Sequence, residues 1–358
     1  MNRARILSLT SSRARRLALF VLFSIFPFPF SSAAAAADQQ ELELRAKQRV
    51  LENVGPGVTA LKRDATGRYY VLVALPNGAG SVVQIFDPEG KRVGQIPAGA
   101  SPSQGKAGDV ASSASIVFGD DLDLDADGRI YVADRGANAI KVYSPDGRLE
   151  RSVRVVAPAS VVALTDGEIA VTTMRPEHLV EVYDAKGQVV REFGVPEEIA
   201  ERADLNRFLN LGRLATDAAH HIYRAFTNLP EPTVRKYDRF GFGLVEIALA
   251  TIDFMPAARA ARREIKRQDE RGGTPVLKPT IRAIGVDPET QHIWIATGGL
   301  LVHFDAGGTR LGTYRIFTAE GMRIEAVDIV VERARLLVAA DPIGIFDIPR
   351  PDKPPAAR

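Results

Sequence analysis

The chain has 358 residues, with 46 Lys and Arg against 44 Asp and Glu, and it contains no cysteine. The lack of cysteine excludes disulfides, thiolate metal sites and a lipid anchor on an N-terminal cysteine. The length is sufficient for a large core, and the nearly balanced charge gives no general attraction to nucleic acid.

Residues 1–37 have the order that is typical of a secretory signal peptide. An arginine-rich segment without acidic residues (1–16) precedes an apolar segment (17–30) and a run of alanines (33–37). The apolar segment is shorter than the roughly 20 residues that a membrane-spanning helix needs, although an uncleaved anchor is the alternative. We expect cleavage after Ala37, export to the periplasm or the extracellular space, and no membrane span in the mature protein. Removing the five arginines of this segment leaves 41 basic against 44 acidic residues.

An aromatic residue followed by Asp or Ser recurs six times along the chain. The copies are Phe86-Asp87, Tyr143-Ser144, Tyr183-Asp184, Tyr237-Asp238, Phe304-Asp305 and Phe346-Asp347. The intervals between them are 57, 40, 54, 67 and 42 residues. The two shortest intervals set a unit of about 41 residues, which is the period of a β-propeller blade, and the longer ones contain insertions.

Each unit carries the signals of four antiparallel strands joined by tight turns. In the second unit, the turn at 125–128 leads into a strand at 129–133, and a second turn at 144–147 follows the aromatic residue. Asp and Gly favour such turns, while β-branched and aromatic residues favour strands. A single sheet of this kind cannot bury its faces, whereas six sheets packed radially bury them. The sequence therefore predicts an all-β, six-bladed β-propeller over residues 55–348.

The second unit resembles an NHL repeat. The resemblance rests on Gly119, on the turn and strand at 125–134, on Asn138 and on the segment at 140–147. The other units match less well, and the sixth matches least. The resemblance implies a six-bladed propeller, but it does not select a function, because the family includes protein-binding, RNA-binding, amidating-lyase and lactonase-like members.

The ends of the propeller and its insertions follow from the spacing of the repeat. The last unit stops after its third strand near Ile348, so we expect the N-terminal segment (38–54) to supply the outer strand that closes the last blade. Residues 349–358 are expected to form a disordered tail. The three long insertions are 97–115, 195–211 and 250–279. The second should contain a short helix, and the third, between blades four and five, a longer one that begins near Pro256.

The insertions fall on the end of the propeller that also carries the turns between the second and third strands, and we call this end the top face. Long loops on a rigid scaffold often bind ligands, although neutral length variation is the alternative. Asp134 and Asn138 match the repeat and are expected to form a turn. The candidate ligand contacts are Arg135, Arg175, His178, Asn228 and Arg282.

The predicted long helix has a basic face. Its basic residues are Arg259, Arg262, Arg263, Lys266 and Arg267. The face predicts a platform for an acidic partner, such as an anionic glycan or a protein. The alternative is an ordinary solvated helix face.

The residue types favour binding over catalysis. A lyase of the amidating type needs several histidines on one ion, and only His178 of the five maps to the top face. A lactonase needs carboxylate and amide oxygens around a divalent cation, for which Glu325, Asn228 and Asp341 are candidates. No nucleophile elbow, phosphate loop or HExxH motif is present.

We therefore predict a non-catalytic propeller outside the cytoplasm, without cofactor or metal. It should recognise a protein or an envelope glycan through its top face, and it should not bind nucleic acid. The alternative is a metal-assisted hydrolase or lactonase with a site at the mouth of the central channel.

Overall fold

The structure is a computed structural model, and it describes residues 42–51, 53–97, 114–174, 177–249 and 254–351. The predicted signal peptide and Arg175 lie outside these residues, as do most of the predicted tail and parts of the insertions. Within the described part of the chain, no helix is long and apolar enough to cross a membrane.

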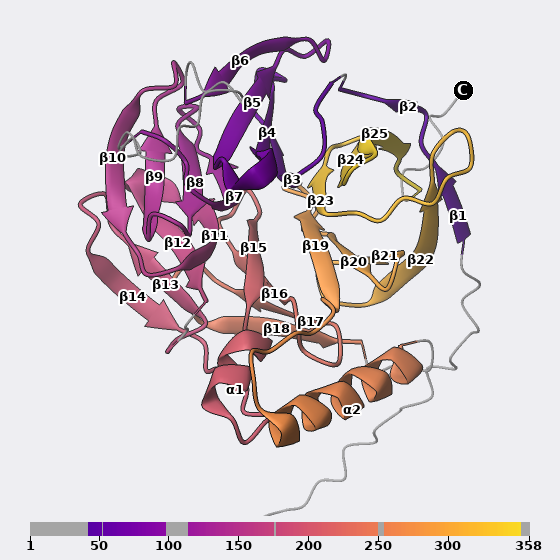
Figure 1. The fold of residues 1–358 in the computed structure, drawn as a ribbon. Coiled ribbons are helices and arrows are strands. Elements are labelled where there is room, and N and C mark those ends of the chain that lie inside the picture. The colour runs from indigo at the N-terminus through magenta and orange to yellow at the C-terminus, as the bar shows by residue number, and fades with distance from the viewer. Residues whose placement is uncertain (1–41, 52, 98–113, 175–176, 250–253, 352–358) are drawn as a thin grey trace, which may run out of the picture. The chain divides into compact units, whose positions relative to one another are not determined.

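Four-stranded antiparallel sheets are arranged around a ring, and each sheet is one blade of a propeller (Figure 1). The first blade consists of β3 (Val58–Arg63), β4 (Tyr69–Ala74), β5 (Ser81–Phe86) and β6 (Arg92–Ile96). The second consists of β7 (Gly119–Leu124), β8 (Ile130–Asp134), β9 (Ala139–Tyr143) and β10 (Leu149–Arg154). The third consists of β11 (Pro158–Ala163), β12 (Ile169–Thr173), β13 (Val180–Tyr183) and β14 (Val189–Phe193).

The remaining three blades have the same order, with the first strand at the centre of the ring. The fourth consists of β15 (Gly212–Thr216), β16 (Ile222–Phe226), β17 (Thr233–Tyr237) and β18 (Gly243–Ala248). The fifth consists of β19 (Ile281–Val286), β20 (Ile293–Thr297), β21 (Leu300–Phe304) and β22 (Arg310–Phe317). The sixth consists of β23 (Asp328–Val331), β24 (Arg335–Ala340) and β25 (Gly344–Pro349), with β2 (Gln48–Arg49) outside β25. The predicted six-bladed propeller is confirmed.

The N-terminal segment fastens the last two blades to the first. β2 runs antiparallel to β25 in the sixth blade, and β1 (Leu42–Arg45) runs parallel to β22 as a fifth strand of the fifth blade. Leu51 then packs in one apolar cluster with residues of the first blade, including Phe86. The sequence contains no signal that predicts the parallel pairing of β1. This segment covers sheet edges that would otherwise be unpaired.

The core consists of six apolar clusters, and each lies between two consecutive blades. The cluster between the first and second blades, for example, joins Leu72 and Ile96 to Leu122. Middle strands such as β8 and β16 are buried along their whole length, because both faces of each sheet meet a neighbour. Each blade is therefore stable only within the ring.

In the first five blades, the turn between the third and fourth strands packs against the outer edge of the blade before it. A glycine with φ between +80° and +96° stands at this contact in five blades: Gly90, Gly147, Gly187, Gly241 and Gly308. A β-carbon on Gly241 would lie 2.5 Å from the ring of Phe193, and one on Gly187 would lie 3.2 Å from Val153. The turn therefore needs glycine both for its backbone conformation and for the close approach of two blades.

Replacing Gly241 by alanine should lower the free energy of unfolding by about 2–4 kcal/mol, because the left-handed backbone and the overpacked contact both penalise a β-carbon. Urea unfolding, followed by circular dichroism, measures the change. Gly243→Ala is the control, because nothing lies within 4 Å of a β-carbon at that position. Equal stability of the two variants would contradict the packing argument.

An ion pair joins the end of the sixth blade to the fifth. Arg350 follows β25, and its guanidinium lies 2.5 Å from the carboxylate of Asp287, with both side chains 6% exposed. Burial raises the pKa of Asp287, but the amide of Thr290 and the guanidinium of Arg350 outweigh it and lower this pKa to about 2. The ion pair therefore stabilises the fold when Asp287 is ionised.

Because the pKa of Asp287 is lower in the folded protein than its ordinary value of 3.8, its contribution is complete above about pH 4 and is lost as the pH falls through 2. Asp287→Asn should remove about 2 kcal/mol of this pH-dependent stability at pH 7, and it should flatten the dependence between pH 4 and pH 2. Chemical unfolding at a series of pH values provides the measurement. An Asn variant that keeps the acid slope of the wild type would show that another carboxylate is responsible.

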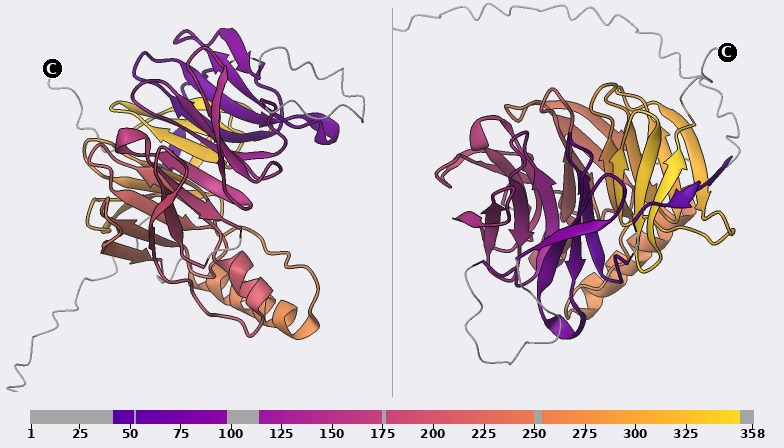
Figure 2. Two further views of the ribbon diagram at one scale, coloured as in Figure 1. Left: turned by 90° about the vertical axis from the view of Figure 1, so that its left-hand side faces the viewer. Right: turned by 90° about the horizontal axis from the view of Figure 1, so that it is seen from above.

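Both α-helices lie in connections between blades at the top face. α1 (Ala203–Leu209) lies between the third and fourth blades, and α2 (Met255–Arg271) lies between the fourth and fifth, which confirms the predicted helical insertion. Pro256 stands in the first turn of α2, as expected. α1 lies beside α2 (Figure 1), and Figure 2 shows α2 and the short 3-10 turn η1 (Pro76–Gly78) on the same side of the ring.

Candidate functional site

One side chain crosses the central channel. Arg213 lies on β15 in the fourth blade, and its guanidinium reaches the first and sixth blades on the far side of the ring. Nη1 and Nη2 donate hydrogen bonds of 3.0 Å to the backbone carbonyls of Val327 and Thr59, respectively. A positive charge therefore stands inside the channel, 3.8 Å from the carboxylate of Asp328.

The inner strands also carry buried and partly buried charges around Arg213. The ammonium of Lys62 lies 3.3 Å from the carboxylate of Asp123. Burial lowers the pKa of Lys62, but Asp123, Asp328 and Asp121 outweigh it and raise this pKa above its usual range. Burial raises the pKa of Asp121 to about 6, and the cations of Lys62 and Arg213 limit this rise.

Replacing Arg213 by methionine should raise the pKa of Asp121 above about 6, because it removes a cation that favours the ionised carboxyl. A carboxyl whose pKa is raised on folding stabilises the protein at low pH, and this contribution is lost as the pH rises through the folded-state pKa. Because the folded-state pKa of Asp121 is higher in the variant, the loss should extend to higher pH than in the wild type. Carboxyl NMR titration measures the pKa. Arg282→Met is the control and should leave Asp121 unchanged. An unaltered titration in the Arg213 variant would contradict the assignment.

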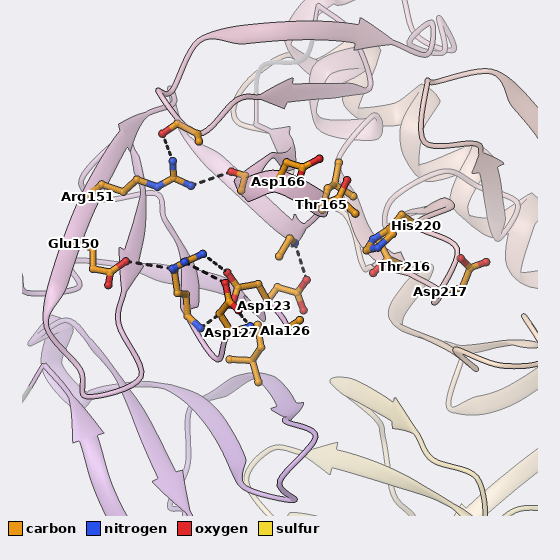
Figure 3. A pocket seen from close by; sticks show the side chains of 17 residues that line it. Asp123, Ala126, Asp127, Glu150, Arg151, Thr165, Asp166, Thr216, Asp217 and His220 are labelled. Atoms are coloured by element: carbon orange, nitrogen blue, oxygen red, sulfur yellow. Dashed lines mark hydrogen bonds and ion pairs between the residues drawn. The ribbon is translucent and has the colours of Figure 1, made fainter.

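The bottom face carries a groove of about 810 Å³ between the turns of the second, third and fourth blades (Figure 3). One wall is the turn η2 (Thr165–Gly167), whose Gly167 carbonyl accepts a hydrogen bond of 3.0 Å from Arg151. The acidic residues that line the groove are Asp123, Asp125, Asp127, Glu150, Asp166 and Asp217.

Several of these carboxylates are used by the fold itself. Asp125 accepts hydrogen bonds from the amide of Arg129 and the hydroxyl of Tyr131, both at 2.9 Å. Asp217 repeats this pattern with Tyr223 at 2.9 Å in the fourth blade. Asp125 and Asp217 are therefore acidic residues that the turns of the bottom face need for their own structure. Over the residues that the structure describes, no three His, Asp or Glu side chains are placed to hold a metal ion.

The top face has a groove of about 420 Å³ between α2 and the turns of the fourth and fifth blades. Its walls are mainly apolar. The helix contributes Ala257, Ala258, Ala260, Ala261, Glu264 and Ile265. The opposite wall consists of Phe254, Asn228, Pro230, Pro232, Thr297, Gly298, Leu300 and the segment 277–280. Such a volume and lining are typical of protein sites that bind apolar groups.

The alanines of α2 leave this space open, while other contacts hold the helix in place. The guanidinium of Arg262 donates two hydrogen bonds, of 2.8 and 2.7 Å, to the carboxylate of Glu231 in the turn of the fourth blade. Ile265 is buried in one cluster with Leu205 and Leu209 of α1. The helix is therefore fixed at its polar edge and along its buried side, and the groove does not depend on a ligand for its shape.

The two helices are also tied end to end. The carboxylate of Asp269 in α2 accepts hydrogen bonds from the amides of Glu201 (2.9 Å) and Arg202 (3.0 Å) just before α1. The guanidinium of Arg202 in turn donates to the carbonyls of Gln268 (2.8 Å) and Gly273 (2.6 Å). Asp269 thereby satisfies two amides immediately before the first turn of α1.

The candidate contacts that lie in the described residues share no partner. Arg135 pairs with Asp120 at 2.6 Å, and Arg282 pairs with Glu325 at 2.9 Å. His178 is exposed in the third blade. Asn228 is the member that lines the top-face groove, where its amide donates to the carbonyl of Phe208 at 2.9 Å. Arg135 and Arg282 are therefore each engaged in an ion pair of their own.

Asp134 and Asn138 have the turn role that the repeat predicts. The carboxylate of Asp134 accepts hydrogen bonds of 2.9 Å from the amides of Val117 and Phe118. Asn138 has a φ of +51° and accepts a hydrogen bond from the amide of Ala157. Both side chains therefore connect the second blade to its flanking loops.

Much of the basic face of α2 is compensated. Arg262 pairs with Glu231, Arg267 with Glu264, and Lys266 lies 3.9 Å from Glu270. In the described residues, Arg259 and Arg263 have no ion-pair partner. Their spacing places them on the side of α2 opposite the groove.

The oxygens of the lactonase hypothesis are also separated. Asp341 accepts a hydrogen bond of 2.6 Å from the amide of Gly57, while Glu325 and Asn228 have the partners given above. The histidines do not form a common site: the rings of His292 and His303 contact each other at 3.0 Å, and His221 pairs with Asp217 at 2.8 Å.

Sequence reasoning missed most of the groove. One signal of the groove in the sequence is the group of alanines in α2. Ala257, Ala260 and Ala261 lie on the side of the helix that faces the propeller, where larger side chains would fill the space. A second signal is the pair Pro230 and Pro232 in the facing turn. Neither signal shows from the sequence alone that the two segments meet.

No protein-family model and no curated protein sequence matches the chain. A solved protein of unknown function from Bacteroides thetaiotaomicron has 10% identity and a TM-score of 0.54, over 87% of this chain and 73% of that chain. A streptogramin B lyase structure has 11% identity and a TM-score of 0.50, over 84% of this chain and 95% of that chain. At these identities the likeness shows the propeller fold alone.

Proposed function

We propose that this protein is a non-catalytic binding propeller that recognises another protein through its top face. The observation that carries the proposal is the preformed apolar groove between α2 and the turns of the fourth and fifth blades. Apolar walls suit the side chains of a protein segment better than the hydroxyl groups of an envelope glycan, because a buried hydroxyl needs a hydrogen-bond partner.

Export and membership in the NHL-repeat class are parts of the same proposal. The arginine-rich and apolar order of residues 1–37 supports secretion, and the repeat of the second blade supports the family. We place the mature protein in the periplasm or outside the cell, where its partner would be an envelope or extracellular protein.

Site-specific photocrosslinking in the producing cells tests the proposal. Benzoylphenylalanine in place of Ala260, which lines the groove, should give discrete protein adducts. Ala261→Trp should reduce these adducts by at least 10-fold, because the indole would fill the space that admits the partner. Mass spectrometry and gel electrophoresis measure the adducts.

The matched control places the same photoreactive residue at Ala126, which is exposed in the bottom groove. Circular dichroism of Ala261→Trp checks that the variant is folded. Adducts from Ala126 but not from Ala260, or adducts that contain only carbohydrate, would contradict recognition of a protein through the top face.

A further inference from the structure

We infer that the top-face groove takes an extended peptide segment that carries apolar side chains followed by acidic residues. This inference rests on the proposed function and adds the chemistry of the partner. The apolar part of the ligand follows from the groove lining, and its acidic part follows from the charges at the groove margin.

The apolar requirement comes from walls that offer few polar groups. Ala257 and Ala261 face the groove from α2, and Leu277 and Leu300 face it from the connecting segment and the start of β21. A ligand that placed hydroxyls or charges against these side chains would lose hydrogen bonds with water and gain none. The volume of about 420 Å³ admits only a few side chains, so the recognised segment is short.

The acidic requirement comes from an imbalance among the charges around the groove. Both acidic residues at this site are compensated: Glu231 by Arg262, and Glu264 by Arg267 and the amide of Gln268. Lys278 lines the groove and is exposed, and in the described part of the chain it has no carboxylate partner. The margin of the groove therefore carries an uncompensated positive charge that favours a carboxylate of the ligand.

The backbone beside Lys278 favours a peptide over a small amphiphilic acid. Across the residues that the structure describes, the amides and carbonyls of Leu277 and Lys278 make no hydrogen bond within the protein. A peptide segment laid along the groove can use such groups as main-chain partners, which an alkyl chain cannot do. One segment of the wall thus offers an apolar side chain, a cation and free main-chain groups.

Fluorescence anisotropy with purified protein tests this chemistry directly. The probe is a labelled peptide that alternates leucine with serine and ends in two glutamates, and its matched partner ends in two lysines. We expect the wild type to bind the glutamate peptide at least 10-fold more tightly. Lys278→Glu should reverse the preference. The charge reversal Lys186→Glu, at an exposed turn of the bottom face, is the control and should change neither affinity.

The outcomes separate this inference from the proposed function. The acidic requirement would be overturned if the wild type and Lys278→Glu each bound the two peptides with equal affinity. If Ala261→Trp then bound neither peptide, the groove would remain the binding site. Binding of decanoate without binding of either peptide would overturn the peptide and assign the groove to a small amphiphile. If Ala261→Trp bound the glutamate peptide as tightly as the wild type does, the groove would not be the binding site, and both proposals would be overturned.

Discussion

The close approach of each outer turn to the blade before it is the constraint on which this protein depends. Every sheet has two apolar faces, and the neighbouring blades cover most of both. The turn glycines, such as Gly187, let successive blades approach closely enough to exclude water. The top-face groove depends on the same packing, since its walls come from two blades and the helix between them.

The repeat made the fold predictable from the sequence, because the same physical need recurs in every blade. Turns such as the one at Asp184 require a carboxylate that accepts hydrogen bonds from amides two and four residues later, and the sequence shows this requirement directly. The pairing of β1 with β22 was not predictable. A strand of four largely exposed residues, such as Leu42–Arg45, does not specify the edge on which it will lie.

The candidate site was harder to predict than the fold. Arg135 and Arg282 are each held by one carboxylate, whereas Arg213, which no motif of the sequence marks, crosses the channel. The groove is made by small and cyclic residues whose importance lies in the space that they leave. Ala261 and Pro230 are ordinary in isolation, and their relation appears only when α2 lies across the fourth blade.

The crossing of the ring by Arg213 has a mechanical consequence. Its guanidinium joins the fourth blade to the first and the sixth, so blades that are not neighbours in the ring are held together by two hydrogen bonds across the channel. A molecule that entered the channel at this level would have to break both of them.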